Sequence, residues 1–354
     1  MSAVPSPTPS IPQHPRHQPS PSSPPPGNPG PADRPGPGGD PLRGQLESLT
    51  TEAHRSDLAA IDRLPTLEIA RVMNREDSGV PGAVEAVLPR IAAAIDAVAA
   101  RMEEGGRLLY TGAGTAGRLG VLDASECPPT FNTDPETVVG LLAGGSEAMV
   151  SAVEGAEDDA AAGAADLDAR GVGPLDTVVG VSASGRTPYA VGAVEHARRL
   201  GALTIGLACN PGTPLGAAAE HPIEVVVGPE LITGSTRLKA GTAQKLVLNM
   251  ISTVTMIRLG KTYGNLMVDV RATNDKLRAR SRRIIALATG APEPAIEKAL
   301  AATGGEVKPA ILMLLADVDA DTAGRLLTDA RGRLRTALLA TGAASGGSAG
   351  SPAG

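Results

Sequence analysis

The sequence of 354 residues has almost no aromatic side chains: it contains no tryptophan, one phenylalanine and three tyrosines. Proteins that bind single-stranded nucleic acid stack its bases on aromatic rings, so we expect no such surface here. The formal net charge of −6 also argues against nucleic acid or an anionic membrane as a partner, because both are bound through basic faces. The hydrophobic core must therefore be aliphatic.

Cysteine is scarce as well, with only Cys127 and Cys209. Two cysteines far apart cannot form a disulfide framework, and this usage is typical of cytosolic proteins. The sequence has no CxxC or HExxH pattern and its five histidines are scattered, so we expect neither a metal nor a cofactor. No apolar run approaches the ~20 residues of a membrane helix, and the N-terminus lacks the features of a signal peptide. We predict a cytoplasmic protein.

Composition divides the chain into four parts. Residues 1–44 are rich in proline, serine and glycine with little that is apolar, which predicts a disordered extension. Residues 45–272 carry the pattern of one large α/β domain, and residues 273–341 that of a small domain made of helices only. The Gly/Ser/Ala-rich end, 342–354, is predicted to be a flexible tail.

Apolar β-type runs alternate with helix patterns in the large domain. The runs lie at 107–111, 137–142, 177–182, 202–208 and 223–227, with helix patterns between them at 119–125, 147–165, 189–200 and 215–220. Further helices are predicted at 81–102, from 238 onward, and at 277–289, 294–303, 308–315 and 321–340. This alternation predicts a parallel sheet with helices on both faces. Ligands of such sheets bind beyond the carboxyl ends of the strands, where the glycine, serine and threonine loops fall.

The first strand runs directly into a glycine-rich stretch that contains Gly112, Gly114 and Gly117. Their spacing matches the dinucleotide fingerprint, but the next strand ends at 141–145 without the acid that would hold a ribose, so a nicotinamide cofactor is disfavoured. Tight packing of a strand against a helix is the structural alternative. It explains the glycines but leaves the neighbouring Thr115 without a role, so we assign Gly112, Gly114 and Thr115 to substrate binding.

A second group of candidate ligands follows the third strand, in the sequence S-A-S-G-R-T at 182–187. Hydroxyls and exposed N–H groups at the start of a helix can cradle a phosphate, and an ordinary helix cap is an equally good interpretation. The ending of a Walker loop is missing, which disfavours a nucleoside triphosphate. The assigned residues are Ser182, Ser184, Gly185 and Thr187, together with Ser235, Thr236 and Lys239 around the start of the helix near 238.

Two acids are candidates for general acid and base chemistry. Glu126 stands in a loop expected between a short helix and the stop formed by Pro128 and Pro129, beside the glycine stretch. Glu157 lies in an acidic run that could equally be a solvated helix face. A carboxylate close to a phosphate-binding loop suggests proton transfer as well as binding.

Four stretches of the sequence are distinctive when they are taken together. They read T-G-A-G-T-A-G-R-L-G-V-L-D-A-S-E-C-P-P-T at 111–130, V-E-G-A-E-D at 153–158, S-A-S-G-R-T-P at 182–188, and G-P-E-L-I-T-G-S-T-R-L-K-A-G-T-A-Q-K at 228–245. In these stretches the chain resembles the N-acetylmuramic acid 6-phosphate etherase family. The last string is long and unusual, and the resemblance extends from about residue 45 to 340. It implies a sugar-isomerase (SIS) phosphosugar-binding fold, a three-layer sandwich that the family shares with the glucokinase regulatory protein.

The resemblance also implies an activity: release of D-lactate from the sugar to give N-acetylglucosamine 6-phosphate in cell-wall recycling. It implies that Glu126 is the proton donor, that Glu157 is the second active-site acid, and that two copies form a homodimer. Many members carry serine where this chain has Ala116, so that hydroxyl cannot be a ligand here.

The reaction expected from this resemblance is an elimination followed by hydration. An open-chain aldehyde acidifies the C2 proton, a base removes it, an acid protonates the departing lactate, and water adds at C3. Two rivals remain open: a regulatory phosphosugar sensor without turnover, and an aldose–ketose isomerase of the same fold. A sensor has no need of the two acids, and an isomerase has no use for an acid that protonates a leaving group.

Overall fold

A computed structural model of the chain describes residues 49–270 and 275–342. The predicted extension at 1–44 and, except for Gly342, the predicted tail lie outside the described residues. Before the sheet come three short 3₁₀ turns, η1 (Thr50–Glu52), η2 (Ser56–Leu58) and η3 (Ile61–Arg63), and then helix α2 (Thr66–Asp77). No helix among the described residues is long and apolar enough to cross a membrane.

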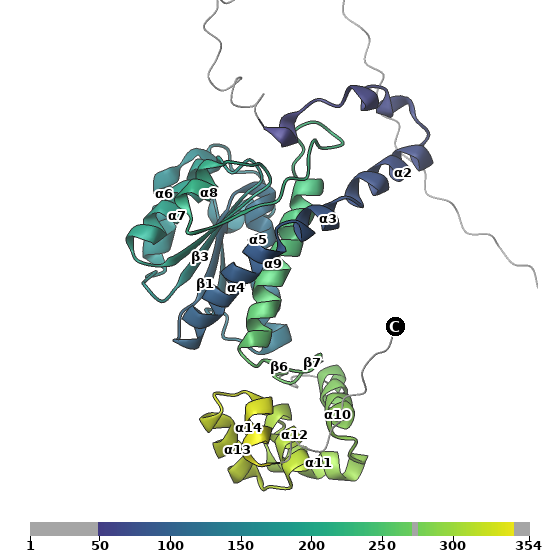
Figure 1. Cartoon of the computed structure of the whole chain (residues 1–354), viewed down its shortest axis with the longest axis vertical. Coiled ribbons are helices and arrows are strands. Elements are labelled where there is room, and N and C mark those ends of the chain that lie inside the picture. The colour runs from purple at the N-terminus through teal and green to yellow at the C-terminus, as the bar shows by residue number, and fades with distance from the viewer. Residues whose placement is uncertain (1–48, 271–274, 343–354) are drawn as a thin grey trace, which may run out of the picture. The chain divides into compact units, whose positions relative to one another are not determined.

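The large domain is built on a parallel sheet of five strands in the order β2-β1-β3-β4-β5 (Figure 1). Their bounds are β1 Leu108–Gly112, β2 Val138–Leu142, β3 Thr177–Ser182, β4 Leu203–Ala208 and β5 His221–Glu224. Gly112 at the end of β1 pairs with Val181 of β3, so the loops that follow these two strands are neighbours. The predicted parallel sheet is confirmed. Its fifth strand begins two residues earlier than expected and includes Pro222, which an edge strand tolerates.

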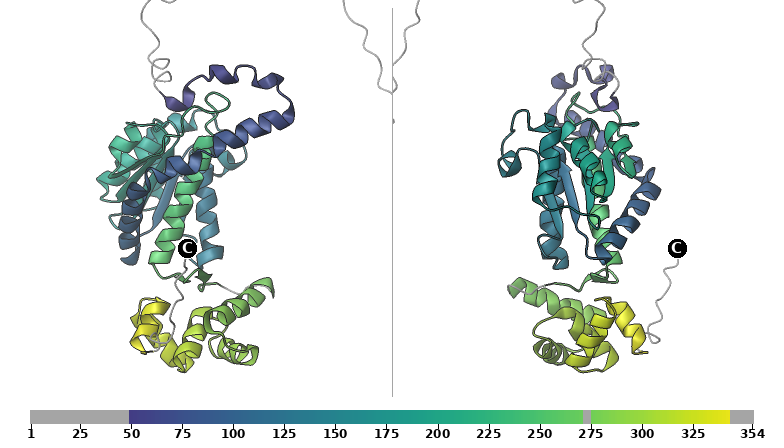
Figure 2. Two further views of the ribbon diagram at one scale, coloured as in Figure 1. Left: turned by 45° about the vertical axis from the view of Figure 1, so that its right-hand side comes forward. Right: turned by 90° about the vertical axis from the view of Figure 1, so that its left-hand side faces the viewer.

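Helices cover both faces of the sheet, which gives the predicted three layers (Figures 1 and 2). One face carries α6 (Ala160–Ala169), α7 (Pro188–Arg199) and α8 (Pro214–Ala218), and the other carries α4 (Leu88–Glu103), α5 (Gly114–Phe131) and α9 (Lys239–Arg258), with α3 (Val80–Glu85) beside α9. Alternate residues of β1 serve the two cores: Leu108 and Tyr110 pack on the side of α4 and α9, and Leu109 packs on the side of α6 and α7.

Helix α5 corrects the expected short helix and loop around Glu126. It runs for 18 residues, from Gly114 through Glu126 and both prolines, and ends at Asn132 in the left-handed conformation. The predicted loop at Glu126 and the predicted stop at Pro128 and Pro129 are therefore wrong. Glycine is tolerated inside this helix because its missing side chain lets the helix lie directly against the sheet. A Cβ atom at Gly120, for example, would come within 2.8 Å of Tyr110 Cβ.

Three other predicted helices are interrupted. The segment 147–165 consists of η4 (Gly145–Met149), η5 (Ala156–Asp158) and α6, because Gly155 has φ +73° and the Asp159 side chain accepts a hydrogen bond from Ala162 N and so begins a new helix. The segment 81–102 is divided into α3 and α4, where Pro89 stands in the first turn of α4. The segment 321–340 is divided into α13 (Ala320–Asp329) and α14 (Leu334–Ala340) by two left-handed residues, Arg331 and Gly332.

The C-terminal part has a hydrophobic core of its own. It consists of a hairpin, β6 (Thr262–Tyr263) and β7 (Leu266–Met267), and of α10 (Asp275–Thr289), α11 (Glu293–Ala302), α12 (Val307–Ala316), α13 and α14. Val268 and Val270, just after the hairpin, already belong to this core. The domain boundary drawn from the sequence at residue 273 stays a prediction.

The contact between α5 and β1 gives a first test. A Cβ atom at Gly117 would lie 2.4 Å from Gly112 O and 2.5 Å from Leu142 Cδ1. Because backbone stands in the way, Gly117→Ala should lower the free energy of unfolding by about 1–3 kcal/mol, measured by urea denaturation. Gly82→Ala in α3 is the matched control, since its Cβ would meet nothing within 4 Å. It should stabilise by up to about 1 kcal/mol; equal effects at the two sites would contradict the packing argument.

Candidate functional site

The serine and threonine loop after β3 folds into a compact cluster of hydroxyls. Ser182 Oγ lies 2.8 Å from Thr187 Oγ1 and 3.3 Å from Ser184 Oγ. It also accepts a hydrogen bond from Gly185 N at 3.0 Å, and Arg186 N donates to Ser184 Oγ at 3.1 Å. Gly185 has φ +67°, the left-handed turn for which glycine is suited. We call Ser182, Ser184, Gly185 and Thr187 the hydroxyl cradle.

The hydroxyl cradle lies where an anion is favoured. Thr187 is the N-cap residue of α7, and no side chain among the described residues caps that helix. The amide groups of the first turn and the helix dipole are therefore available to a phosphate. Pro188 at the first helical position is preorganised for this start. The sequence prediction that these residues gather at one strand end agrees with the fold, and their role in binding stays a prediction.

The glycine stretch lies beside the hydroxyl cradle, because β1 and β3 are neighbours. Gly114 opens α5 with φ +53°, and no side chain caps α5 within the described structure. Thr115 in the first turn faces α9: a Cβ atom at Gly241 would lie 3.5 Å from both Thr115 Cγ2 and Thr236 O. The fold thus brings Thr115 and Thr236 together from segments more than a hundred residues apart.

The N-terminus of α9 is capped by the side chain of Glu230, which was not predicted from the sequence. The fully buried carboxylate of Glu230 accepts hydrogen bonds from Lys239 N at 3.0 Å and Ala240 N at 2.9 Å. Neither Ser235 nor Thr236 caps this helix. Glu230 stands nine residues before α9, outside any capping pattern, so nothing local in the sequence could have identified it. Its negative charge occupies the place where an anion would otherwise bind.

Lys239, predicted to contact substrate, is engaged elsewhere in the structure. Its Nζ donates to Glu76 Oε2 of α2 at 2.9 Å, and the Lys239 side chain is only 7% exposed. Arg55 Nη1 donates to the same carboxylate oxygen at 3.1 Å. The hydrogen bond from Lys239, followed by that from Arg55, lowers the pKa of Glu76 below its usual value. This triad ties the segment before the sheet to the start of α9.

The loop after β4 is tied to the N-terminal segment as well. Asn210 Oδ1 accepts hydrogen bonds from Thr50 N and Thr50 Oγ1, both at 2.8 Å, and Asn210 Nδ2 donates to Ala183 O at 3.0 Å. Asn210 is buried and connects η1 with the loop that begins the hydroxyl cradle. Asn210 is not among the site residues predicted from the sequence, although an asparagine that follows a predicted parallel strand closely is a usable signal.

Glu157 lies at the carboxyl edge of the sheet, in the exposed turn η5. Its loop returns to the end of β2, since a Cβ atom at Gly144 would lie 2.8 Å from Val153 Cβ. Arg118 of α5 holds the preceding segment by donating to Ala148 O at 2.9 Å and Met149 O at 3.2 Å. Glu157 is therefore on the same edge as the hydroxyl cradle.

Glu126 is on α5, exposed, and far from that edge. The twelve residues from Gly114 to Glu126 span about 18 Å at 1.5 Å per residue. This is longer than a single sugar 6-phosphate. The structure therefore places Glu157 and the hydroxyl cradle on the same edge of the sheet, and α5 carries Glu126 away from that edge.

A buried polar network lies beneath Glu126. Asp123, one turn earlier on α5, accepts hydrogen bonds from Tyr110 Oη at 2.8 Å, Asn249 Nδ2 at 2.6 Å and Ser252 Oγ at 3.2 Å. Burial raises the pKa of Tyr110, and Asp123 adds to this effect. Burial likewise raises the pKa of the Cys127 thiol to about 12, so this thiol is no nucleophile at neutral pH.

Comparison with known proteins identifies the family. An N-acetylmuramic acid 6-phosphate etherase of Streptomyces coelicolor is 74% identical over 299 residues, covering 84% of this chain and 96% of that protein. The enzyme of the same name from Escherichia coli is 54% identical, covering 83% and 99%. The chain belongs to the N-acetylmuramic acid 6-phosphate etherase family. The family resemblance stated from the sequence is thereby confirmed.

The domain comparisons agree with this membership. The SIS domain matches residues 159–254, and the N-terminal SIS domain of the glucokinase regulatory protein matches residues 90–198. Among solved structures, a phosphoheptose isomerase from Francisella tularensis is 20% identical with a TM-score of 0.43, covering 55% of this chain and all of that one.

The Glu76 triad predicts a pH dependence of stability. A carboxylate with a lowered folded-state pKa stabilises the fold above its unfolded pKa, and this contribution is lost as the pH falls through the folded value. Glu76→Gln should therefore cost about 1.5–3 kcal/mol at pH 7, and the difference from wild type should shrink as the pH falls through and below the usual glutamate range. Urea denaturation at several pH values measures this. Glu68→Gln is the control, because the Glu68 pair with Arg71 on the same helix is exposed and worth under about 1 kcal/mol. A Glu76→Gln deficit that stays constant down to acid pH would contradict the assignment.

Proposed function

We propose that the chain cleaves the D-lactyl ether of N-acetylmuramic acid 6-phosphate to give N-acetylglucosamine 6-phosphate and D-lactate. The observation that carries the proposal is the hydroxyl cradle at the open start of α7, with a carboxylate on the same sheet edge, in a chain of this family. The cradle fits the dianionic 6-phosphate, since hydroxyls and helix amides together stabilise a phosphate. With both cysteines free and buried, we place the reaction in the cytoplasm.

The chemistry follows from the two carboxylates. Glu157 shares the edge with the cradle, so we assign it to removal of the C2 proton once the sugar ring has opened. Glu126 then protonates the lactate oxygen at C3, and water adds to the unsaturated intermediate. Each such acid or base contributes about 10²–10⁴ in rate.

The position of Glu126 supports a site that is shared between two copies of the chain. Glu126 lies about 18 Å along α5 from Gly114 at the start of that helix. This is too far for it to contact a sugar held in the cradle of its own chain. We propose a homodimer in which Glu126 of each copy reaches the cradle of the other. A closed two-fold pair would make two equivalent sites of this kind.

The surface around Glu126 supports such a pairing. Leu122, one turn before it on α5, is an apolar side chain that is 53% exposed. Helix α9 runs beside α5 (Figures 1 and 2), joined to it by the Asn249–Asp123 hydrogen bond. Exposed apolar side chains around a functional carboxylate are typical of a surface that a partner covers.

A kinetic test separates catalysis from binding. Glu126→Gln should lower kcat for D-lactate release by about 10²–10⁴ while sugar-phosphate affinity is kept. The double variant Ser184→Ala/Thr187→Ala should mainly raise KM, because it removes two hydroxyls of the cradle.

The control for both variants is Glu154→Gln. Glu154 is an exposed acid in the loop of Glu157, and this variant should keep wild-type kinetics. Normal turnover by Glu126→Gln would refute its role, and a wild type that binds the sugar phosphate without releasing lactate would favour a regulatory sensor.

A mixing test decides whether Glu126 acts between subunits. Glu126→Gln and Glu157→Gln copies, each nearly inactive alone, are co-expressed with different tags. In a mixed dimer one site combines an intact Glu157 with the intact Glu126 of the other copy. Random pairing makes half of the dimers mixed, so about a quarter of the wild-type rate should return. Light scattering should give the mass of a dimer. Mixed dimers without activity would show that both acids act within one chain.

A further inference from the structure

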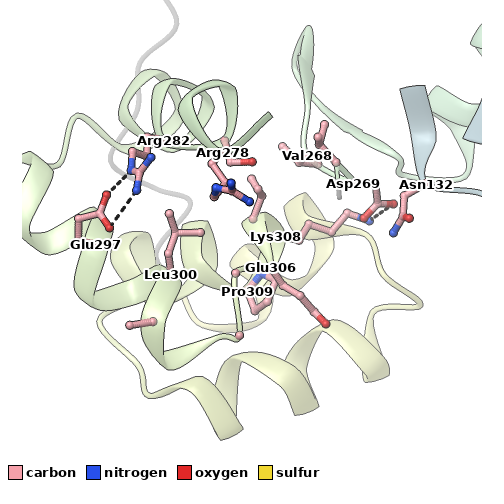
Figure 3. A pocket seen from close by; sticks show the side chains of 16 residues that line it. Asn132, Val268, Asp269, Arg278, Arg282, Glu297, Leu300, Glu306, Lys308 and Pro309 are labelled. Carbon is pink, nitrogen blue, oxygen red and sulfur yellow. Dashed lines mark hydrogen bonds and ion pairs between the residues drawn. The ribbon is translucent and has the colours of Figure 1, made fainter. Parts of the chain in front are cut away.

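A cavity of about 810 Å³ lies in the C-terminal helical part, away from the residues of the candidate site (Figure 3). Its walls come from α10, α11, the loop before α12 and the segment after β7. Its size is in the range of small-molecule sites, about 300–1,000 Å³. Leu300, Val268 and Val307 supply an apolar part of the lining. The proposed etherase reaction uses none of these residues.

The first sign of a ligand is an orphaned hydroxyl. Ser281 of α10 lines the cavity and is 1% exposed, and its Oγ has no hydrogen-bond partner within the described structure. A buried polar atom without a partner is destabilising, and a bound acceptor or donor would relieve this cost. Arg278 stands three residues earlier, on the same face of α10, and its guanidinium points into the cavity (Figure 3).

The charge on Arg278 is not neutralised by the cavity wall. Its ion-pair partner is Asp275, which does not line the cavity and whose side chain is 97% exposed; such pairs contribute little. Each acidic side chain of the cavity wall either forms an ion pair with another residue or points away from Arg278. Asp269 is shared by Lys308 Nζ at 2.8 Å and Lys261 Nζ at 3.2 Å, Glu297 pairs with Arg282, and the Glu306 side chain extends away from Arg278 (Figure 3).

The start of α12 adds to the attraction for an anion. The cavity is lined by residues 304–309, which include the first turn of this ten-residue helix, and no described side chain caps it. The N-terminal amides of a helix and its dipole favour an anion. Two lysines sharing Asp269 leave one positive charge in excess beside this helix start.

We propose that this cavity is a second binding site, for a small organic oxyanion (a carboxylate or a phosphate). The anionic end contacts Arg278, Ser281 and the first amides of α12, and the carbon skeleton of an organic ligand lies against Leu300 and Val307. This site is distinct from the hydroxyl cradle, and its existence does not depend on the etherase reaction.

Calorimetric titration of the full chain with inorganic phosphate, and separately with D-lactate, tests the proposal. The titrations use the Ser184→Ala/Thr187→Ala background, so that the hydroxyl cradle does not compete. Binding of at least one probe should persist there and should weaken at least tenfold when Arg278→Gln and Ser281→Ala are added. The probe that binds more tightly distinguishes a phosphate from a carboxylate ligand.

Arg280→Gln is the matched control, since Arg280 is an exposed arginine of α10 that does not line the cavity. It should bind both probes as the background does. Thermal unfolding without ligand checks that the cavity variants are folded. Their unfolding temperature should match that of the background, because removing an unpartnered hydroxyl should cost no stability. The proposal is overturned if neither probe binds in the background, or if the cavity variants bind as tightly as the control.

Discussion

The close approach of α5 to β1 determines the geometry of the whole catalytic arrangement. Gly112, Gly117 and Gly120 remove the side chains that would hold the helix away from the sheet. Helix α5 therefore starts where β1 ends and runs back along the sheet for 18 residues. Its first turn lies beside the hydroxyl cradle, while Glu126 is carried toward the opposite edge. A looser contact would leave both the phosphate-binding end and the position of the acid undefined.

Electrostatics then distinguishes helix starts that look alike in sequence. The starts of α5 and α7 carry no side-chain cap among the described residues and can stabilise an anion. That of α9 is closed by Glu230, a buried carboxylate held by two amides. A phosphate near α9 would meet this negative charge in a medium of low dielectric constant. These charges favour the loops after β1 and β3, which are neighbours in the sheet, over the start of α9 as the place for the phosphate of the proposed substrate.

The layers and the sheet could be predicted from the sequence because apolar strands buried on both faces leave a strong local pattern. The hydroxyl cradle could be predicted for the same reason, as it directly follows such a strand. The path of α5 could not, because glycine and proline suggest a turn locally, whereas here the tertiary contact with Tyr110 and Leu142 outweighs their low helix propensity. Glu230 and the pairing of Lys239 with Glu76 depend on contacts across the chain, which no local pattern records.

If Glu126 is the acid of the proposed reaction, its separation from the hydroxyl cradle has a physical consequence. In the proposed pair of chains the acid would come from the partner copy, so each site would be complete only when the exposed apolar side chain of Leu122 is covered. The Asp123 network beneath Glu126 fixes α5 to α9, so the helix that carries the acid is rigid before any partner arrives. Rigid placement reduces the entropy lost in forming the site. In the proposed dimer, turnover would depend on assembly, because the Glu126 of each copy would act on the sugar held in the cradle of the other copy.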